Sequence, residues 1–177
     1  MTSPLSRPEI WEQLASVRYG LVELRTFEQW LYTVQELEAA IGQDQYLALV
    51  SFEFDQPHAQ HELTRVIDRL YEEVRPSQLR RDAATAIARA FLDGRGDLIT
   101  TARMLTRFRN DGESWVPDEF VYIDSELDDL PMPAEYPNWD QQALAARLAK
   151  WQPRLAEFER AAREVSREML LKVEHNA

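Results

Sequence analysis

The segment "LAARLAKWQPRLAEFERAAREVSREM", residues 144–169, contains the most regular apolar pattern in the chain. Its apolar side chains are separated alternately by four and three residues, at Leu144, Leu148, Trp151, Leu155, Phe158, Ala162, Val165 and Met169. This spacing predicts a long helix with one continuous apolar stripe. Because a proline inside a helix removes a backbone hydrogen bond and crowds the preceding turn, Pro153 predicts a kink or a restart near Trp151.

The apolar stripe has two interpretations. It can pack on other helices of the same chain, as the stripe of an amphipathic helix usually does. It can also form a coiled-coil contact with a second copy, because alternating steps of four and three are the spacing of a heptad repeat. A homodimer through the 144–169 helix is therefore an alternative that the sequence leaves open.

Further helices are predicted before this segment. Ser6 with Glu9 has the pattern of a capping box, and Thr26 with Gln29 repeats it. Asp97 is a predicted N-cap residue. Apolar spacing and stop signals predict helices over residues 6–20, 26–42, 57–73, 79–92 and 97–110. The run "YLALVSFEF", residues 46–54, fits either a short helix or a strand, and we favour a helix after Gln43 with an extended end near Phe52. The sequence thus predicts an all-α protein, a multi-helix bundle that ends in a long C-terminal helix.

Size and composition favour a single helical domain over residues 1–177, since domains usually contain about 100–200 residues. The content of hydrophobic residues, 45%, is too high for general disorder. We expect no membrane partner, because the apolar runs are shorter than the ~20 residues that a spanning helix needs. We expect a cytoplasmic location, because the first residues lack a secretory pattern and the chain has no cysteine.

Residues 110–146 contain ten Asp and Glu residues and no Lys or Arg, in a chain whose net charge is −11. Such a field repels nucleic acid and attracts cations or basic proteins, so we expect no nucleic-acid partner. Prolines at 117, 131, 133 and 137 disfavour helix. Because aromatic residues lie among the carboxylates, we expect a long ordered acidic loop over about residues 110–138.

The acidic loop is also the predicted partner-binding site. Carboxylates would steer the encounter with a basic protein, and aromatic rings would supply contact area. The predicted site residues are Asp118, Glu119, Tyr122, Asp124, Glu126, Asp128, Asp129, Tyr136 and Trp139. In the alternative interpretation, the carboxylates are neutralised within the chain by arginines of its basic middle part, namely Arg75, Arg80, Arg81, Arg103, Arg107 and Arg109.

Catalytic and metal-binding patterns are weak. His58 and His61 lie three residues apart near several carboxylates, which leaves a metal-dependent enzyme as an alternative. A hydrolytic zinc helix would instead place its histidines four residues apart with a glutamate between them. The carboxylates of residues 110–138 do not follow the order of an EF-hand calcium loop. No Ser/His/Asp order, phosphate-binding loop or dinucleotide motif is present, so we expect no enzymatic activity and no cofactor.

Two segments resemble parts of small bacterial helical proteins. The first is "TFEQWLYTVQELEAAIGQDQYLALVSFEF", residues 26–54, which is similar to a pattern found in several immunity proteins of polymorphic toxins. The second is "FVYIDSELDDLPMPAEYPNWDQQAL", residues 120–144, which resembles a recurring phrase with threonine where this chain has Leu127. The resemblance implies a protein that binds and silences a toxin domain delivered by contact-dependent or type VI secretion, with a cognate basic toxin as its partner.

Overall fold

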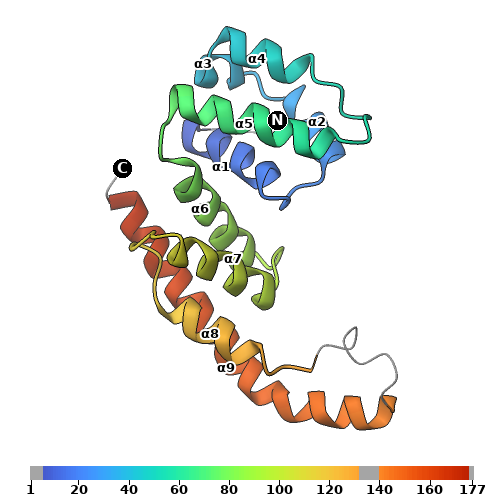
Figure 1. Ribbon diagram of the computed structural model, residues 1–177. Helices are drawn as coiled ribbons and strands as arrows, with labels where there is room; N and C mark the ends of the chain where they lie inside the picture. Colours follow the sequence, from blue (N-terminus) through green and yellow to red (C-terminus); the bar gives the residue numbers. More distant parts are fainter. Residues whose placement is uncertain (1–5, 132–139, 176–177) are drawn as a thin grey trace. The chain divides into compact units, whose positions relative to one another are not determined.

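The computed structural model describes residues 6–131 and 140–175, and within these ranges it contains nine helices and no strand (Figure 1). The predicted all-α class is confirmed. The chain divides into two compact units, Met1–Ile87 and Ala88–Ala177, and the boundary between them falls in α6 (Leu79–Leu92). We refer to these as the N-terminal unit and the C-terminal unit. The expectation that residues 1–177 fold as one domain stays a prediction.

The N-terminal unit is built around the contact between its first and its fifth helix. Its complete helices are α1 (Arg7–Arg18), α2 (Leu24–Leu31), α3 (Leu37–Ile41), α4 (Gln43–Val50) and α5 (Ala59–Val74). Helix α1 packs against α3 and α5, and α4 packs against α3 and α5 (Figure 1). Trp11 and Leu14 of α1 and Leu63 and Ile67 of α5 are fully buried. Because each pair is three or four residues apart, each helix turns one apolar face to the core.

The predicted helix starts at Ser6 and Asp97 are confirmed. A carboxylate oxygen of Glu9 accepts hydrogen bonds from the backbone N–H of Ser6 at 2.7 Å and from its hydroxyl at 2.6 Å. The side chain of Asp97 accepts a hydrogen bond from the backbone N–H of Thr100 at 2.9 Å. The bonds from the backbone N–H groups of Ser6 and Thr100 satisfy donors that a helix terminus leaves without an intrahelical partner.

The single helix predicted over residues 26–42 is wrong. Helix α2 begins at Leu24, before the expected cap at Thr26, and ends at Leu31, and α3 follows after a turn. Leu31 and Leu37 are both buried. Six residues apart, they would point in very different directions from a continuous helix, so the turn between them lets both enter the core.

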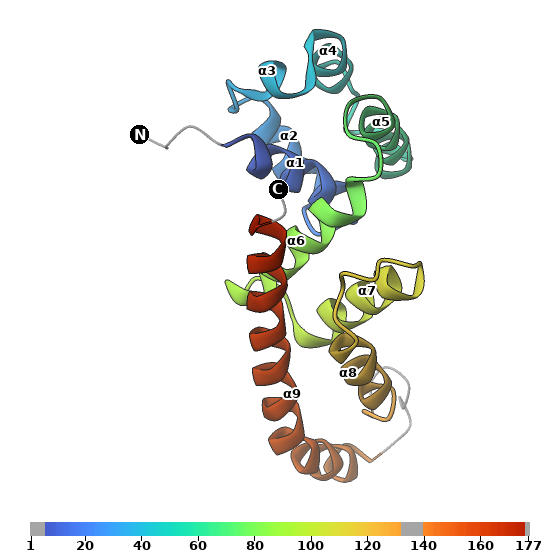
Figure 2. The ribbon, with the colours of Figure 1, turned by 90° about the vertical axis from the view of Figure 1, so that its left-hand side faces the viewer.

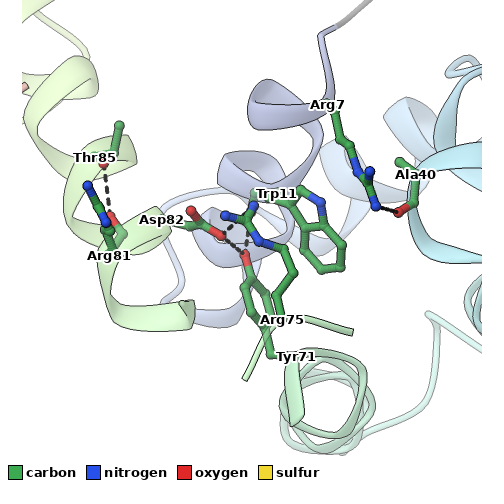
Figure 3. A network of polar contacts seen from close by, with 8 residues as sticks. All are labelled: Arg7, Trp11, Ala40, Tyr71, Arg75, Arg81, Asp82 and Thr85. Atoms are coloured by element: carbon green, nitrogen blue, oxygen red, sulfur yellow. Dashed lines mark hydrogen bonds and ion pairs between the residues drawn. The ribbon is translucent and has the colours of Figure 1, made fainter. Parts of the chain in front are cut away.

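A cluster of polar side chains joins α1, α5 and α6 within the N-terminal unit (Figure 3). The Tyr71 hydroxyl lies 2.8 Å from the carbonyl oxygen of Trp11 and 3.0 Å from a carboxylate oxygen of Asp82. Nη1 of Arg75 lies 3.2 Å from that same oxygen, and its guanidinium lies over the Trp11 ring. Burial raises the pKa of Asp82, and the charge of Arg75 opposes this shift.

The C-terminal unit consists of α7 (Leu98–Asn110), α8 (Glu119–Leu127) and α9 (Gln141–His175), preceded by the end of α6. Helices α7 and α8 pack against each other, and both contact α9. Helix α9 continues through Pro153 and does not restart there. Its first turns, orange in Figures 1 and 2, run in a different direction from its red remainder, as expected for a helix with an internal proline.

Arg163 attaches the middle of α9 to the end of α6. Its Nη1 donates hydrogen bonds to the carbonyl oxygens of Phe91 at 3.2 Å and Leu92 at 3.1 Å. The guanidinium also lies 4.8 Å from the centre of the Phe91 ring. A cation at the C-terminal end of a helix satisfies its last carbonyl groups and opposes their negative partial charge. This contact therefore stabilises the end of α6 within the C-terminal unit.

The long acidic loop predicted over about residues 110–138 is also wrong in its central part, which forms α8. Pro117 precedes the first turn and Pro131 follows the last, so neither proline interrupts the helix. Phe120, Ile123 and Leu127 have helical spacing and are buried. The spacing of these three residues indicates a helix. The prediction of a loop gave more weight to the prolines between residues 117 and 137 than to this spacing.

Candidate partner-binding surface

Helix α8 separates its apolar residues from its carboxylates. Its buried side faces the rest of the C-terminal unit with Phe120, Ile123 and Leu127. The opposite side and the two ends of the helix are exposed. Five of the predicted site residues are exposed here and form what we call the acidic surface: Asp118, Glu119, Tyr122, Asp128 and Asp129. The helix therefore brings together residues that the sequence placed in a loop.

Tyr122 is the exposed aromatic residue of this surface, with 58% of its area accessible. Its ring contacts the ring of Phe158 from α9 edge to face, with 6.2 Å between the centroids. Phe158 is buried in the C-terminal unit. The contact orients the Tyr122 ring while leaving most of it accessible, so little side-chain entropy is lost when a partner covers it.

Two carboxylates of α8 and its N-cap are paired with arginines. Asp118 accepts a hydrogen bond of 2.5 Å from Nε of Arg109, and this bond holds the pKa of Asp118 below its usual range. Glu126 forms an ion pair with Arg154 of α9. Asp118 therefore stays ionised at neutral pH, and the arginines restrict the orientation of both carboxylates.

Asp124 is in a different environment because its side chain is half-buried. Burial raises its pKa, the nearby charge of Asp128 raises it further, and Arg103 opposes both effects. Nε of Arg103 lies 3.8 Å from Asp124, and its Nη2 lies 4.0 Å from Asp128. Asp124 is therefore less exposed than the residues of the acidic surface, and its role in partner contact stays a prediction.

Neutralisation within the chain is partial. Of the arginines expected to pair with the acidic block, Arg103 and Arg109 contact carboxylates of α8 and its caps. The sequence reasoning missed Arg154, because only the packing of α9 against α8 brings it to Glu126. Among the described residues, Glu119 and Asp129 are exposed and form no ion pair. These two carboxylates give the acidic surface its uncompensated charge.

Two predicted anchors, Tyr136 and Trp139, lie outside the described residues. The histidines of the metal alternative are both exposed at the beginning of α5, His58 as the N-cap residue and His61 in the first turn. In residues 6–131 and 140–175 no three His, Cys, Asp or Glu side chains are grouped so that they could hold a metal ion. The structure therefore adds no support to the metal-dependent enzyme.

None of the helices in the described ranges combines the length and the apolar character needed to cross a membrane. Comparison of the chain with models of protein families, with curated proteins and with solved structures found no match.

Proposed function

We propose that this protein is a cytoplasmic immunity protein that binds a basic toxin domain and neutralises it. The observation that supports this proposal best is the acidic surface, where an exposed and oriented tyrosine lies between unpaired carboxylates. The resemblance of residues 26–54 to immunity proteins is a separate argument from sequence. The partner would be a protein with a basic cleft, and occlusion of that cleft would silence it.

The two kinds of side chain have different roles in this binding. Glu119 and Asp129 form no ion pair among the described residues and attract a basic surface over several ångströms, which mainly raises the association rate. Tyr122 supplies apolar contact area and a hydroxyl group, which mainly slows dissociation. The arginine partners of Asp118 and Glu126 keep those side chains in place before the partner arrives.

Charge reversal tests the role of the carboxylates. The double variant Glu119→Lys/Asp129→Lys is expected to lower the association rate with the captured partner by about tenfold at low ionic strength, because steering depends on charge. The difference should shrink in ~0.5 M salt, where the Debye length is only a few ångströms. Stopped-flow fluorescence or surface plasmon resonance would measure both rates.

The matched control is Glu38→Lys/Asp55→Lys, which changes the net charge equally at exposed positions of the N-terminal unit. The partner itself would come from a pull-down with tagged protein from a lysate of the organism that encodes the chain. If both double variants slow association to the same extent, net charge is responsible and the acidic surface is not the contact. Unchanged rates in both would exclude steering altogether.

Homodimerisation is a second candidate, supported by the exposure of α9. In its first half Leu148, Trp151 and Leu155 are half-exposed, whereas Phe158 and Ala162 further along are buried within the C-terminal unit. The first half of the apolar stripe is therefore the part more accessible to a second copy. Its length, about three turns, is short for a coiled coil that must form without other contacts.

The variant Leu148→Glu/Trp151→Glu separates this candidate from the first. If the stripe forms a dimer, light scattering of the wild-type protein should give the mass of two chains, and the variant should give the mass of one. A wild-type protein of one-chain mass at ~100 μM would exclude a stable dimer, since a standard interface associates well below that concentration. Partner capture by the variant should be unaffected.

A further inference from the structure

Helix α4 packs loosely on α5 within the N-terminal unit. Of its eight residues only Leu49 is fully buried, although "YLALV", residues 46–50, is apolar. Ala48 is exposed and its short side chain leaves space beside α5. The result is a partly open pocket of about 250 Å³ lined by Asp44, Gln45, Ala48, Leu49, Val66, Arg69, Leu70 and Glu73.

The pocket has an apolar part and an acidic end. Ala48, Leu49, Val66 and Leu70 supply the apolar part. The amide of Gln45 donates a hydrogen bond of 3.0 Å to a carboxylate oxygen of Glu73, which brings the beginning of α4 next to the end of α5.

The charged residues that line the pocket include more carboxylates than cationic groups. Asp44 precedes Gln45 at the acidic end, so two carboxylates and one guanidinium, that of Arg69, line the pocket. After accepting from Gln45, Glu73 still has lone pairs free for another donor. The pocket therefore favours a ligand with a positively charged group beside its carboxylates and an apolar group beside Ala48, Leu49, Val66 and Leu70.

We propose that this pocket binds an organic cation that joins a benzene-sized apolar group to an ammonium or guanidinium group. Its volume is sufficient, because an apolar cavity of about 150 Å³ already accommodates benzene. The site lies in the N-terminal unit and its residues are separate from the acidic surface of α8. It is therefore independent of the proposed inhibition of a toxin.

The test uses 4-fluorophenethylammonium as the probe and fluorine NMR as the measurement. The matched control ligand is 3-(4-fluorophenyl)propionate, which has the same ring and the opposite charge. The ammonium is expected to bind with a Kd of about 1 mM, which is typical for a ligand of this size. The propionate should bind at least about tenfold more weakly, since it loses a charge-assisted contact. Equal binding of both, tighter binding of the propionate, or no binding of the ammonium would overturn the proposal.

Two variants locate the binding. Ala48→Phe should abolish binding of the ammonium by filling the pocket from an exposed position, and Ala39→Phe, at an exposed position of α3, should leave it unchanged. Glu73→Gln should weaken it by about tenfold through loss of the carboxylate. Unaltered binding in Ala48→Phe would place the probe elsewhere and overturn the proposal. If circular dichroism shows that this variant is unfolded, Ala48→Met is the substitute.

An apolar group joined to a cation can belong either to a free organic amine or to the side chains of a basic protein. A blocked Lys-Phe dipeptide, added in excess over the bound probe, distinguishes the two sources. Displacement of the probe assigns the site to protein side chains. Retention of the probe assigns it to free organic cations, and the pocket is then a small-molecule site.

Discussion

Replacement of Arg75 by methionine is expected to destabilise the N-terminal unit by roughly 2–3 kcal/mol at neutral pH, because it leaves the Asp82 carboxylate buried without its cationic partner. The side chain of Asp82 is only 13% exposed and Nη1 of Arg75 lies 3.2 Å from it. Methionine keeps much of the contact with the Trp11 ring, so the loss of charge dominates. Chemical denaturation followed by tryptophan fluorescence measures this cost.

The double variant Arg75→Met/Asp82→Asn should recover a large part of the lost stability, since no charge is then left unpaired. The cost of Arg75→Met should also shrink as the pH is lowered. Burial already raises the pKa of Asp82, and removal of Arg75 raises it further, so acid converts the carboxylate to its neutral form. A cost that is independent of pH, or no recovery in the double variant, would contradict the role given to this pair (Figure 3).

Asp82 itself makes stability depend on pH. Its folded-state pKa lies above the ordinary value, so the folded state holds this proton more tightly than the unfolded state. Its contribution is complete below the ordinary carboxylate range and is lost as the pH rises through the raised value. Denaturation of wild-type protein and Asp82→Asn at a series of pH values measures it, and their stability difference should shift against the wild type as the pH increases.

Phe120→Ala is expected to cost about 3–5 kcal/mol in the stability of the C-terminal unit, as is usual when a fully buried aromatic ring is removed. Phe120 has no exposed area and lies on the inner side of α8. Tyr122→Ala, two residues along the same helix, should cost less than about 1 kcal/mol because its ring is mostly exposed. Thermal or urea denaturation of the two variants gives this comparison.

The variants Phe120→Ala and Tyr122→Ala also distinguish an effect on stability from an effect on partner binding. Tyr122→Ala should raise the dissociation rate from the partner while the protein remains folded, whereas Phe120→Ala should impair binding only by unfolding the unit. Similar losses of stability in the two variants would mean that residues 119–127 do not form a helix with one buried side. A stable Tyr122→Ala protein with unaltered dissociation would remove Tyr122 from the contact surface.

Much of the helical structure could be predicted because its signals are local. The cap at Asp97 and the spacing of the apolar residues in α5 and α6 involve residues within one or two turns of each other. The errors occurred where a local signal was ambiguous. The prolines around 117–137 suggested a loop, although they leave room for a short helix. The capping pattern at Thr26 did not mark the start of α2, which begins at Leu24, and the continuous apolar spacing over 26–42 did not show the turn that lets both Leu31 and Leu37 enter the core.

The all-α class, the long C-terminal helix and the excess of negative charge before it follow from the sequence alone, because composition and short-range spacing are sufficient to specify them. The sequence alone does not determine which carboxylates form ion pairs with arginines. Arg154 reaches Glu126, and Phe158 supports Tyr122, because α9 packs beside α8 from a distant part of the chain. Ion pairs and ring contacts depend on distances across the fold, and these distances exist only after the helices have packed.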